Sequence, residues 1–112
     1  QQPARGLRVD GARTLPMARA DLAGLEFAWA AFTAAQPQAD ANAKKAFFTG
    51  WGELWAKTQT ADNLRAELQT SPYAPNALRV NTTLAQFAPF GETFGCRVGA
   101  NMRAKTPTAV WR

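Results

Sequence analysis

Residues 17–32 read MARADLAGLEFAWAAF, and this stretch decides the fold class. Its large apolar side chains recur at helical spacing, which places them on one face of a helix; they are Leu22, Leu25, Trp29 and Phe32. Pro16 suits the first turn of such a helix, and Pro37 ends it. The sequence therefore predicts an amphipathic helix whose apolar face must pack against another surface.

The rest of the chain predicts shorter helices joined by loops. A second helix is expected from about residue 41 to 57, with one apolar face formed by Phe47, Trp51, Leu54 and Trp55. Thr60 is the expected N-cap of a third helix, and Asp62 lies in its first turn. Pro89 opens a small last helix, after which residues 95–112 form a tail over the surface. Short extended pieces are expected at residues 7–9 and at Arg79–Asn81.

These elements make a mainly α fold of three to four helices with a Pro-rich loop, in a single domain of 112 residues. We expect a lead-in and turn over 1–15, helices over 16–69, a loop over 70–82, and a short helix with a tail over 83–112. The loop contains TSPYAPNALRVN, in which two prolines bracket Tyr73 and Arg79 follows. Proline fixes the backbone, so this loop is expected to present these two side chains.

Composition excludes several classes of function. The net charge is +5, from 13 Lys and Arg against 8 Asp and Glu, but the basic residues are scattered and form no stripe. Charges dispersed in this way usually keep a protein soluble and do not form a binding surface, so no nucleic-acid partner is expected. No apolar run approaches the roughly 20 residues of a membrane span. No signal-peptide pattern opens the chain, so any such segment is expected to have been removed.

The chain contains no histidine and one cysteine, Cys96. Nucleophile–histidine pairs and zinc–histidine sites therefore cannot be complete within these residues.

The chain contains four Trp and seven Phe, which is more aromatic bulk than a small domain usually needs. Either the core is dense, or part of this surface packs against another chain.

Several stretches, in order, resemble the C-terminal part of the neprilysin-like zinc metallopeptidases. LRVDGARTLPMARADLAGLEFAW (7–29) resembles the family segment T-x-G-E-N-x-A-D-x-G-G-L, and KKAFFTGWGELWAKT (44–58) resembles its FF…A-x-x-W helix. TSPYAPNALRVNTTLAQFAPFGETFGC (70–96) resembles the run that begins D-x-H-S-P and continues R-V-N-G. GANM (99–102) and TAVWR (108–112) resemble the family's G-D-x-M and final C-R-x-W.

The resemblance implies a zinc endopeptidase architecture. In the family, two histidines of a helical H-E-x-x-H bind zinc, and the glutamate between them is the general base. A third ligand is the Glu of E-N-x-A-D, and the Asp one turn later orients a ligand histidine. The His of D-x-H-S-P stabilises the oxyanion, and the Arg that follows holds a substrate carbonyl.

Only part of this constellation matches. Asp21 stands at the position of the histidine-orienting Asp, and Arg79 at that of the substrate-binding Arg. Met17 replaces the zinc-ligating Glu, and its thioether is a poor zinc ligand. Tyr73 replaces the oxyanion-stabilising His, and the H-E-x-x-H segment would lie before residue 1. No cofactor is therefore expected in this chain, and zinc only if a partner chain supplies ligands.

Each of these residues also has a structural interpretation. Met17 suits core packing, and Tyr73 is either a packing anchor or an oxyanion donor. Arg79 is either a ligand contact or a salt-bridge partner of Asp21 or Glu67. Cys96 matches a family cysteine whose disulfide partner precedes this segment, and Thr108 stands where the final family cysteine would be.

The sequence thus predicts a C-terminal segment or subunit of a neprilysin-like homologue that contributes to a peptide-binding cleft and is not catalytic alone. The expected partner is an N-terminal metallopeptidase chain or the rest of a cleaved precursor, and peptides are possible ligands. One alternative is an active zinc endopeptidase completed by a partner that carries H-E-x-x-H. Another is a helical interaction module that reuses the scaffold. The R-V-N loop and the Ala- and Arg-rich composition suggest a bacterial source, and the resemblance implies a periplasmic or otherwise extracytoplasmic location.

We predict that the isolated chain aggregates or binds hydrophobic dyes, because its aromatic helix faces would normally lie against a partner. Analytical ultracentrifugation and dye fluorescence measure this directly. A monomer that unfolds cooperatively and binds no dye would contradict the partner hypothesis.

Overall fold

A computed structural model describes residues 9–56 and 60–110 of the chain. It contains five helices: α1 (Gly11–Ala35), α2 (Ala41–Glu53), α3 (Ala61–Thr70), α4 (Asn76–Ala85) and α5 (Ala88–Phe94). The mainly α class is confirmed, and the described ranges include no strand. The helix count of three to four was too low, since there are five.

Helix α4 replaces an expected extended piece. Arg79–Asn81 was predicted to be extended, but these residues lie inside α4. Pro75 is the N-cap of this helix and Asn76 its first residue, so the second proline of the loop starts a helix and does not prevent one. The Pro-rich loop is therefore shorter than predicted and lies between α3 and α4.

Helix α1 begins before the predicted start. The side chain of Asp10 accepts a hydrogen bond from the backbone N–H of Arg13 and caps the helix at Gly11. Pro16 consequently lies inside α1 and not in its first turn. The helix ends at Ala35, just before Pro37, as predicted.

Of the other helix ends, the start of α3 follows the sequence closely and the end of α2 does not. The Thr60 side chain accepts a hydrogen bond from the backbone N–H of Asn63 and caps α3, with Asp62 in the first turn. Helix α2 ends at Glu53, earlier than the predicted end. The predicted extended piece at Leu7 and the predicted helix end at Lys57 lie outside the described residues.

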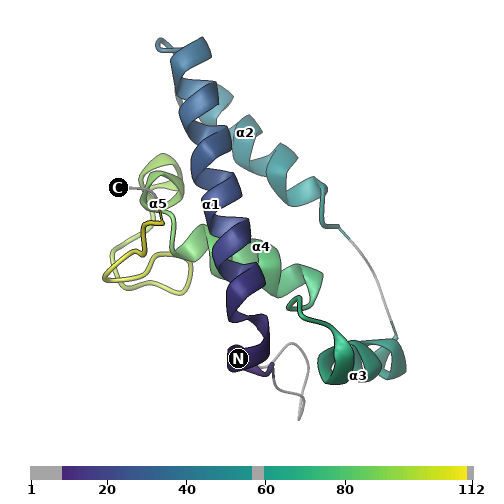
Figure 1. Cartoon of the computed structure of the whole chain (residues 1–112). Helices are drawn as coiled ribbons and strands as arrows, with labels where there is room; N and C mark the ends of the chain where they lie inside the picture. The colour runs from purple at the N-terminus through teal and green to yellow at the C-terminus, as the bar shows by residue number, and fades with distance from the viewer. Residues whose placement is uncertain (1–8, 57–59, 111–112) are drawn as a thin grey trace.

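Helices α1 and α2 lie close to each other near the turn that joins them and then diverge, and α4 crosses α1 (Figure 1). Helix α4 contacts both α1 and α5, and α5 also contacts α2. Helix α3 lies at the end of the molecule near the start of α1 (Figure 1), where the Arg13 side chain donates a hydrogen bond to the Leu68 carbonyl oxygen at 2.8 Å. The fold is thus organised around α1 and α4.

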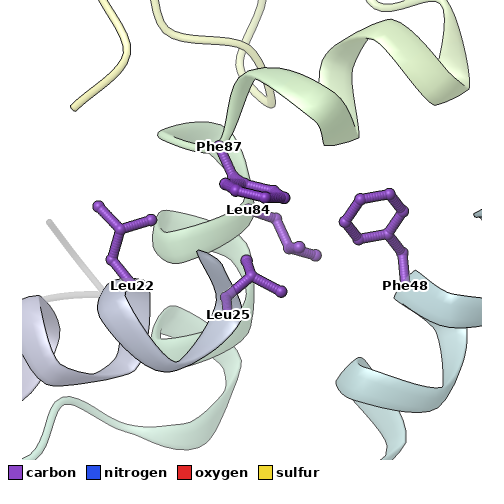
Figure 2. Close-up of a cluster of buried hydrophobic side chains, with 5 residues drawn as sticks. All are labelled: Leu22, Leu25, Phe48, Leu84 and Phe87. Carbon is purple, nitrogen blue, oxygen red and sulfur yellow. The ribbon is translucent and has the colours of Figure 1, made fainter. Parts of the chain in front are cut away.

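The core lies where α1, α2, α4 and the start of α5 meet (Figure 2). It consists of the buried side chains Leu22, Leu25, Phe48, Leu84 and Phe87. Trp29 of α1 stacks on Phe48 of α2 with ring centroids 5.0 Å apart. Much of the aromatic bulk therefore packs inside the chain, although Phe27 remains 69% exposed. The aliphatic side chain of Leu54 is also exposed, at 72%.

The chain after α5 folds back over α4 and α1. The backbone N–H of Ala104 donates to the carbonyl oxygen of Ala85, and the Thr108 N–H and hydroxyl both lie 3.0 Å from Gln86 Oε1. The Val110 N–H donates to Glu26 Oε1 at 2.9 Å. This confirms the predicted tail over the surface. Among the described residues, no helix is long and apolar enough to cross a membrane.

A close approach between α5 and this tail gives a stability prediction. A Cβ atom at buried Gly91 would lie 2.6 Å from Arg103 Cδ, and Arg103 Nη1 is held by the Cys96 carbonyl oxygen at 2.7 Å. We expect Gly91→Ala to lower the free energy of unfolding by about 1–3 kcal/mol, because Arg103 must leave its place. Urea unfolding followed by circular dichroism measures the change.

Two further variants control this prediction. In an Arg103→Ala background the clash disappears, so Gly91→Ala should become neutral or stabilising. Gly24→Ala in α1, where the added carbon would meet nothing within 4 Å beyond its chain neighbours and the adjacent backbone of its own helix, should stabilise the protein by up to about 1 kcal/mol. An equal cost of Gly91→Ala in both backgrounds would show that the contact with Arg103 is not the cause.

Candidate functional site

The strongest candidate site is an ion pair that joins α1 to α4. Arg79 donates from Nε to Asp21 Oδ2 and from Nη2 to Asp21 Oδ1, each at 2.9 Å. The two side chains are only 14% and 12% exposed. Parallel N–H···O bonds of this kind are stronger and more directional than a single contact. Of the two partners that the sequence left open for Arg79, the structure selects Asp21 over Glu67.

Two aromatic rings pack against the same guanidinium group. Its central carbon lies 3.8 Å from the ring centroid of Trp55 and 4.4 Å from that of Tyr73. Both distances are within the range of cation–π attraction. Tyr73 is therefore in contact with Arg79 through the face of its ring, a contact that the sequence did not predict.

Two hydrogen bonds help to place these rings at Arg79, one between distant segments and one within the loop. The Asn76 side chain, at the start of α4, donates to the Trp55 carbonyl oxygen at 2.9 Å and so ties the segment after α2 to α4. The Tyr73 backbone N–H donates to Ser71 Oγ at 3.0 Å within the loop. The buried Pro75 then begins α4. The loop is therefore shaped by its own sequence, whereas Trp55 depends on a contact between distant segments.

A pocket of about 360 Å³ lies beside the ion pair, between α1 and α4. Its walls are mainly apolar, with threonine hydroxyls at intervals; the lining includes Leu15, Leu22, Leu78, Thr82, Asp21 and Arg79. Binding sites for small ligands commonly combine an apolar wall with a few polar groups in this way. The pocket therefore places the ion pair at a surface that a ligand can reach.

The other positions that the resemblance singled out, Met17, Cys96 and Thr108, are not part of this ion pair. Met17 is half-buried on α1, one turn before Asp21, and it is not part of the core cluster. Cys96 is a half-buried free thiol, and Thr108 hydrogen-bonds Gln86. Met17 thus does not have the core role that its sequence position suggested.

The donor atoms on α1 do not suit zinc. Met17 offers a thioether, and both carboxylate oxygens of Asp21 accept hydrogen bonds from Arg79. Across residues 9–56 and 60–110, no three His, Cys, Asp or Glu side chains gather closely enough to hold a metal ion.

Trp55 is the member of the site that the sequence did not identify. Its helical spacing indicated only a position on an apolar face, and no local pattern relates residue 55 to residue 79. In the structure its ring packs on Arg79, and its indole Nε1 is buried without a hydrogen-bond partner among the described residues. An unpaired buried donor is uncommon in folded proteins and distinguishes this position from ordinary core tryptophans.

The fold and site describe a helical segment with a part-buried Asp–Arg pair beside a pocket. The sequence model of peptidase family M13 matches residues 1–110. The chain therefore belongs to peptidase family M13.

Individual relatives agree with this assignment. Neprilysin-1 of Caenorhabditis elegans is 29% identical in an alignment 116 positions long, which covers 94% of this chain and 15% of the relative. Endothelin-converting enzyme 1 of Rattus norvegicus is 30% identical in an alignment 115 positions long, which covers 95% of this chain and 15% of the relative. Neprilysin of Homo sapiens is 28% identical in an alignment 117 positions long, which covers 96% of this chain and 16% of the relative.

The chain thus spans about 15% of the length of the curated relatives that it matches. No solved structure matched it significantly.

The ion pair gives a second stability prediction. Asp21→Ala should lower the free energy of unfolding by about 3 kcal/mol, because it leaves a mostly buried guanidinium without its carboxylate. Asp21→Leu combined with Arg79→Met should recover most of this loss, since no buried charge remains. Urea unfolding of the three proteins measures these differences.

The matched control is Arg65→Ala, which removes the exposed Arg65–Asp62 pair of α3. This change should cost less than about 1 kcal/mol, as is usual for surface ion pairs. If Asp21→Ala were as mild as Arg65→Ala, the pair would not hold α1 to α4.

Proposed function

We propose that this chain forms part of a peptide-binding cleft in a neprilysin-like metallopeptidase and is not catalytic alone. Membership of peptidase family M13 supports the enzyme class. The site supports the role in binding, because its main charged group is a rigidly held hydrogen-bond donor beside a pocket. We propose that the match corresponds to the C-terminal part of the family's catalytic domain.

The geometry of Arg79 is the observation that carries this proposal. An arginine has five N–H donors, and Asp21 takes one from Nε and one from Nη2. Within residues 9–56 and 60–110 no acceptor takes the donors on Nη1, which can therefore meet an acceptor from outside, and Arg79 lines the pocket. A peptide carbonyl oxygen is such an acceptor, and its hydrogen bond to a charged group contributes about 1.5–3 kcal/mol.

We assign Asp21 a positioning role in this cleft. It fixes the guanidinium through two bonds, so little side-chain freedom is lost when a peptide binds. In the family pattern the equivalent Asp orients a zinc-bound histidine. This chain has no histidine, so in these residues Asp21 orients the Arg79 guanidinium group.

Peptide hydrolysis would require a further polypeptide segment. That segment would have to supply H-E-x-x-H and, because Met17 stands at the ligand position, a substitute for the third zinc ligand. We therefore propose the rest of a metallopeptidase domain as the partner. Exposed apolar side chains such as Leu54 and Phe27 offer surface for that contact. An extracytoplasmic location is part of the same proposal.

Peptide binding by Arg79 variants tests the function. The chain, alone and assembled with an M13 polypeptide that carries H-E-x-x-H, is titrated with an N-acetylated peptide amide in a calorimeter. Arg79→Ala should weaken binding by about 10-fold or more, because a charge-assisted hydrogen bond is lost. Arg79→Lys, which keeps the charge but not the paired donors, should be intermediate.

Arg97→Ala, at an exposed position after α5, is the matched control and should leave affinity unchanged. Equal affinity of wild type and both Arg79 variants for the peptide would contradict the proposed peptide-binding cleft.

Metal analysis of the assembly separates the alternative functions. Stoichiometric zinc with chelator-sensitive hydrolysis would establish an active endopeptidase, and tight self-association without peptide binding would favour an interaction module.

A further inference from the structure

Tyr73 carries an inference beyond the proposed function. In the family pattern its position belongs to a residue that donates a hydrogen bond to an oxyanion. Here, however, the ring of Tyr73 packs against a guanidinium, with 4.4 Å between its centroid and Arg79 Cζ. A cation–π contact uses the ring face and does not need the hydroxyl group. The observed contact therefore suggests a function for the ring.

Three groups together restrict the Arg79 side chain. Asp21 holds Nε and Nη2 through two hydrogen bonds of 2.9 Å, which fix the direction of the guanidinium within its plane. Such a pair can still tilt about the axis that joins the two groups. The rings of Trp55 and Tyr73 pack against the guanidinium and oppose this tilt.

Tyr73 is itself held in place. Its backbone N–H is bonded to Ser71 Oγ, and Pro72 and Pro75 restrict the backbone on either side. Tyr73 is nevertheless 42% exposed, so the structure keeps a large aromatic ring at the surface, in contact with a residue that lines the pocket. A residue whose only purpose was to fill the core would be expected to be buried.

We propose that Tyr73 is a positioning residue: its ring, with that of Trp55, fixes the plane of the Arg79 guanidinium so that the Nη1 donors can meet a peptide carbonyl group. The hydroxyl group of Tyr73 takes no part in this role. The inference rests on the proposed peptide-binding function of Arg79. It assigns to this position a role in preorganising the site and none in stabilising an oxyanion.

Three variants of the full chain separate the ring from the hydroxyl group. Tyr73→Phe keeps the ring, Tyr73→Leu removes it, and Tyr73→His restores the residue of the family pattern. The first measurement is the proton shift of Arg79 Nε–H in protein labelled with ¹⁵N-arginine, because an aromatic ring over the group displaces that signal. The second is affinity for an N-acetylated dipeptide amide.

We expect Tyr73→Phe to match wild type in both measurements. Tyr73→Leu should move the Arg79 signal toward that of an unstacked arginine and weaken peptide binding about fivefold. Tyr73→His should fall between these two, since imidazole is a smaller ring. The matched control is Phe94→Leu, which removes an equally exposed ring, 42%, that lies over Lys45 and not over Arg79. It should change neither measurement.

Two results would overturn the inference. If Tyr73→Phe weakened binding as much as Tyr73→Leu, the hydroxyl group would be the functional part. If Tyr73→Leu left both the Arg79 signal and the affinity unchanged, the ring would not position Arg79. A wild-type chain that bound no peptide, alone or assembled, would overturn the proposed function instead, and the Arg79 signal in the same samples would still decide whether the ring holds the guanidinium.

Discussion

The two hydrogen bonds between Arg79 and Asp21 are the interaction on which this structure depends. They join residues 58 positions apart and fix α4 against α1 with a defined direction. The apolar contacts beside them, through Leu22, Leu25 and Leu84, supply burial but little orientation. The ion pair also lies beside the pocket, so one contact determines both how the helices are arranged and which donor atoms a ligand would meet. A change at either residue should therefore affect fold and binding together.

Because the Asp21–Arg79 pair affects both the arrangement of the helices and the donor atoms beside the pocket, it helps to explain how the site differs from the family pattern. We propose that Met17 replaces a zinc ligand of the family pattern in this segment, whereas the pair that links two helices, Asp21 and Arg79, keeps the residues of that pattern. Asp21 and Arg79 satisfy each other without a metal ion, and a mostly buried pair is costly to break on one side only. The proposed replacement at Met17 is thus compatible with a stable arrangement of α1 and α4. The rings of Trp55 and Tyr73 pack against Arg79, which itself lines the pocket.

The sequence predicted well what depends on local patterns. The apolar face of α1 identified Leu22 and Leu25 as core residues, and the cap at Thr60 followed from its side-chain chemistry. Helix α4 was missed because prolines on either side of Tyr73 indicated a loop, although proline is also suited to a helix start. The contact of Trp55 with Arg79 could not be predicted, since it exists only after α2 and α4 are brought together by tertiary packing. Asp21 was recognised as one of two partners for Arg79, and only the folded geometry could choose between them.

The central claim is that Arg79, held by Asp21, is the ligand-binding donor of this segment. A crystal structure of the chain, assembled with an M13 polypeptide and soaked with an N-acetylated peptide amide, tests this most directly. Our account predicts a peptide carbonyl oxygen within hydrogen-bond distance of Arg79 Nη1 while both bonds to Asp21 persist. A peptide bound elsewhere, or an Arg79 side chain that leaves Asp21 to reach it, would contradict the account.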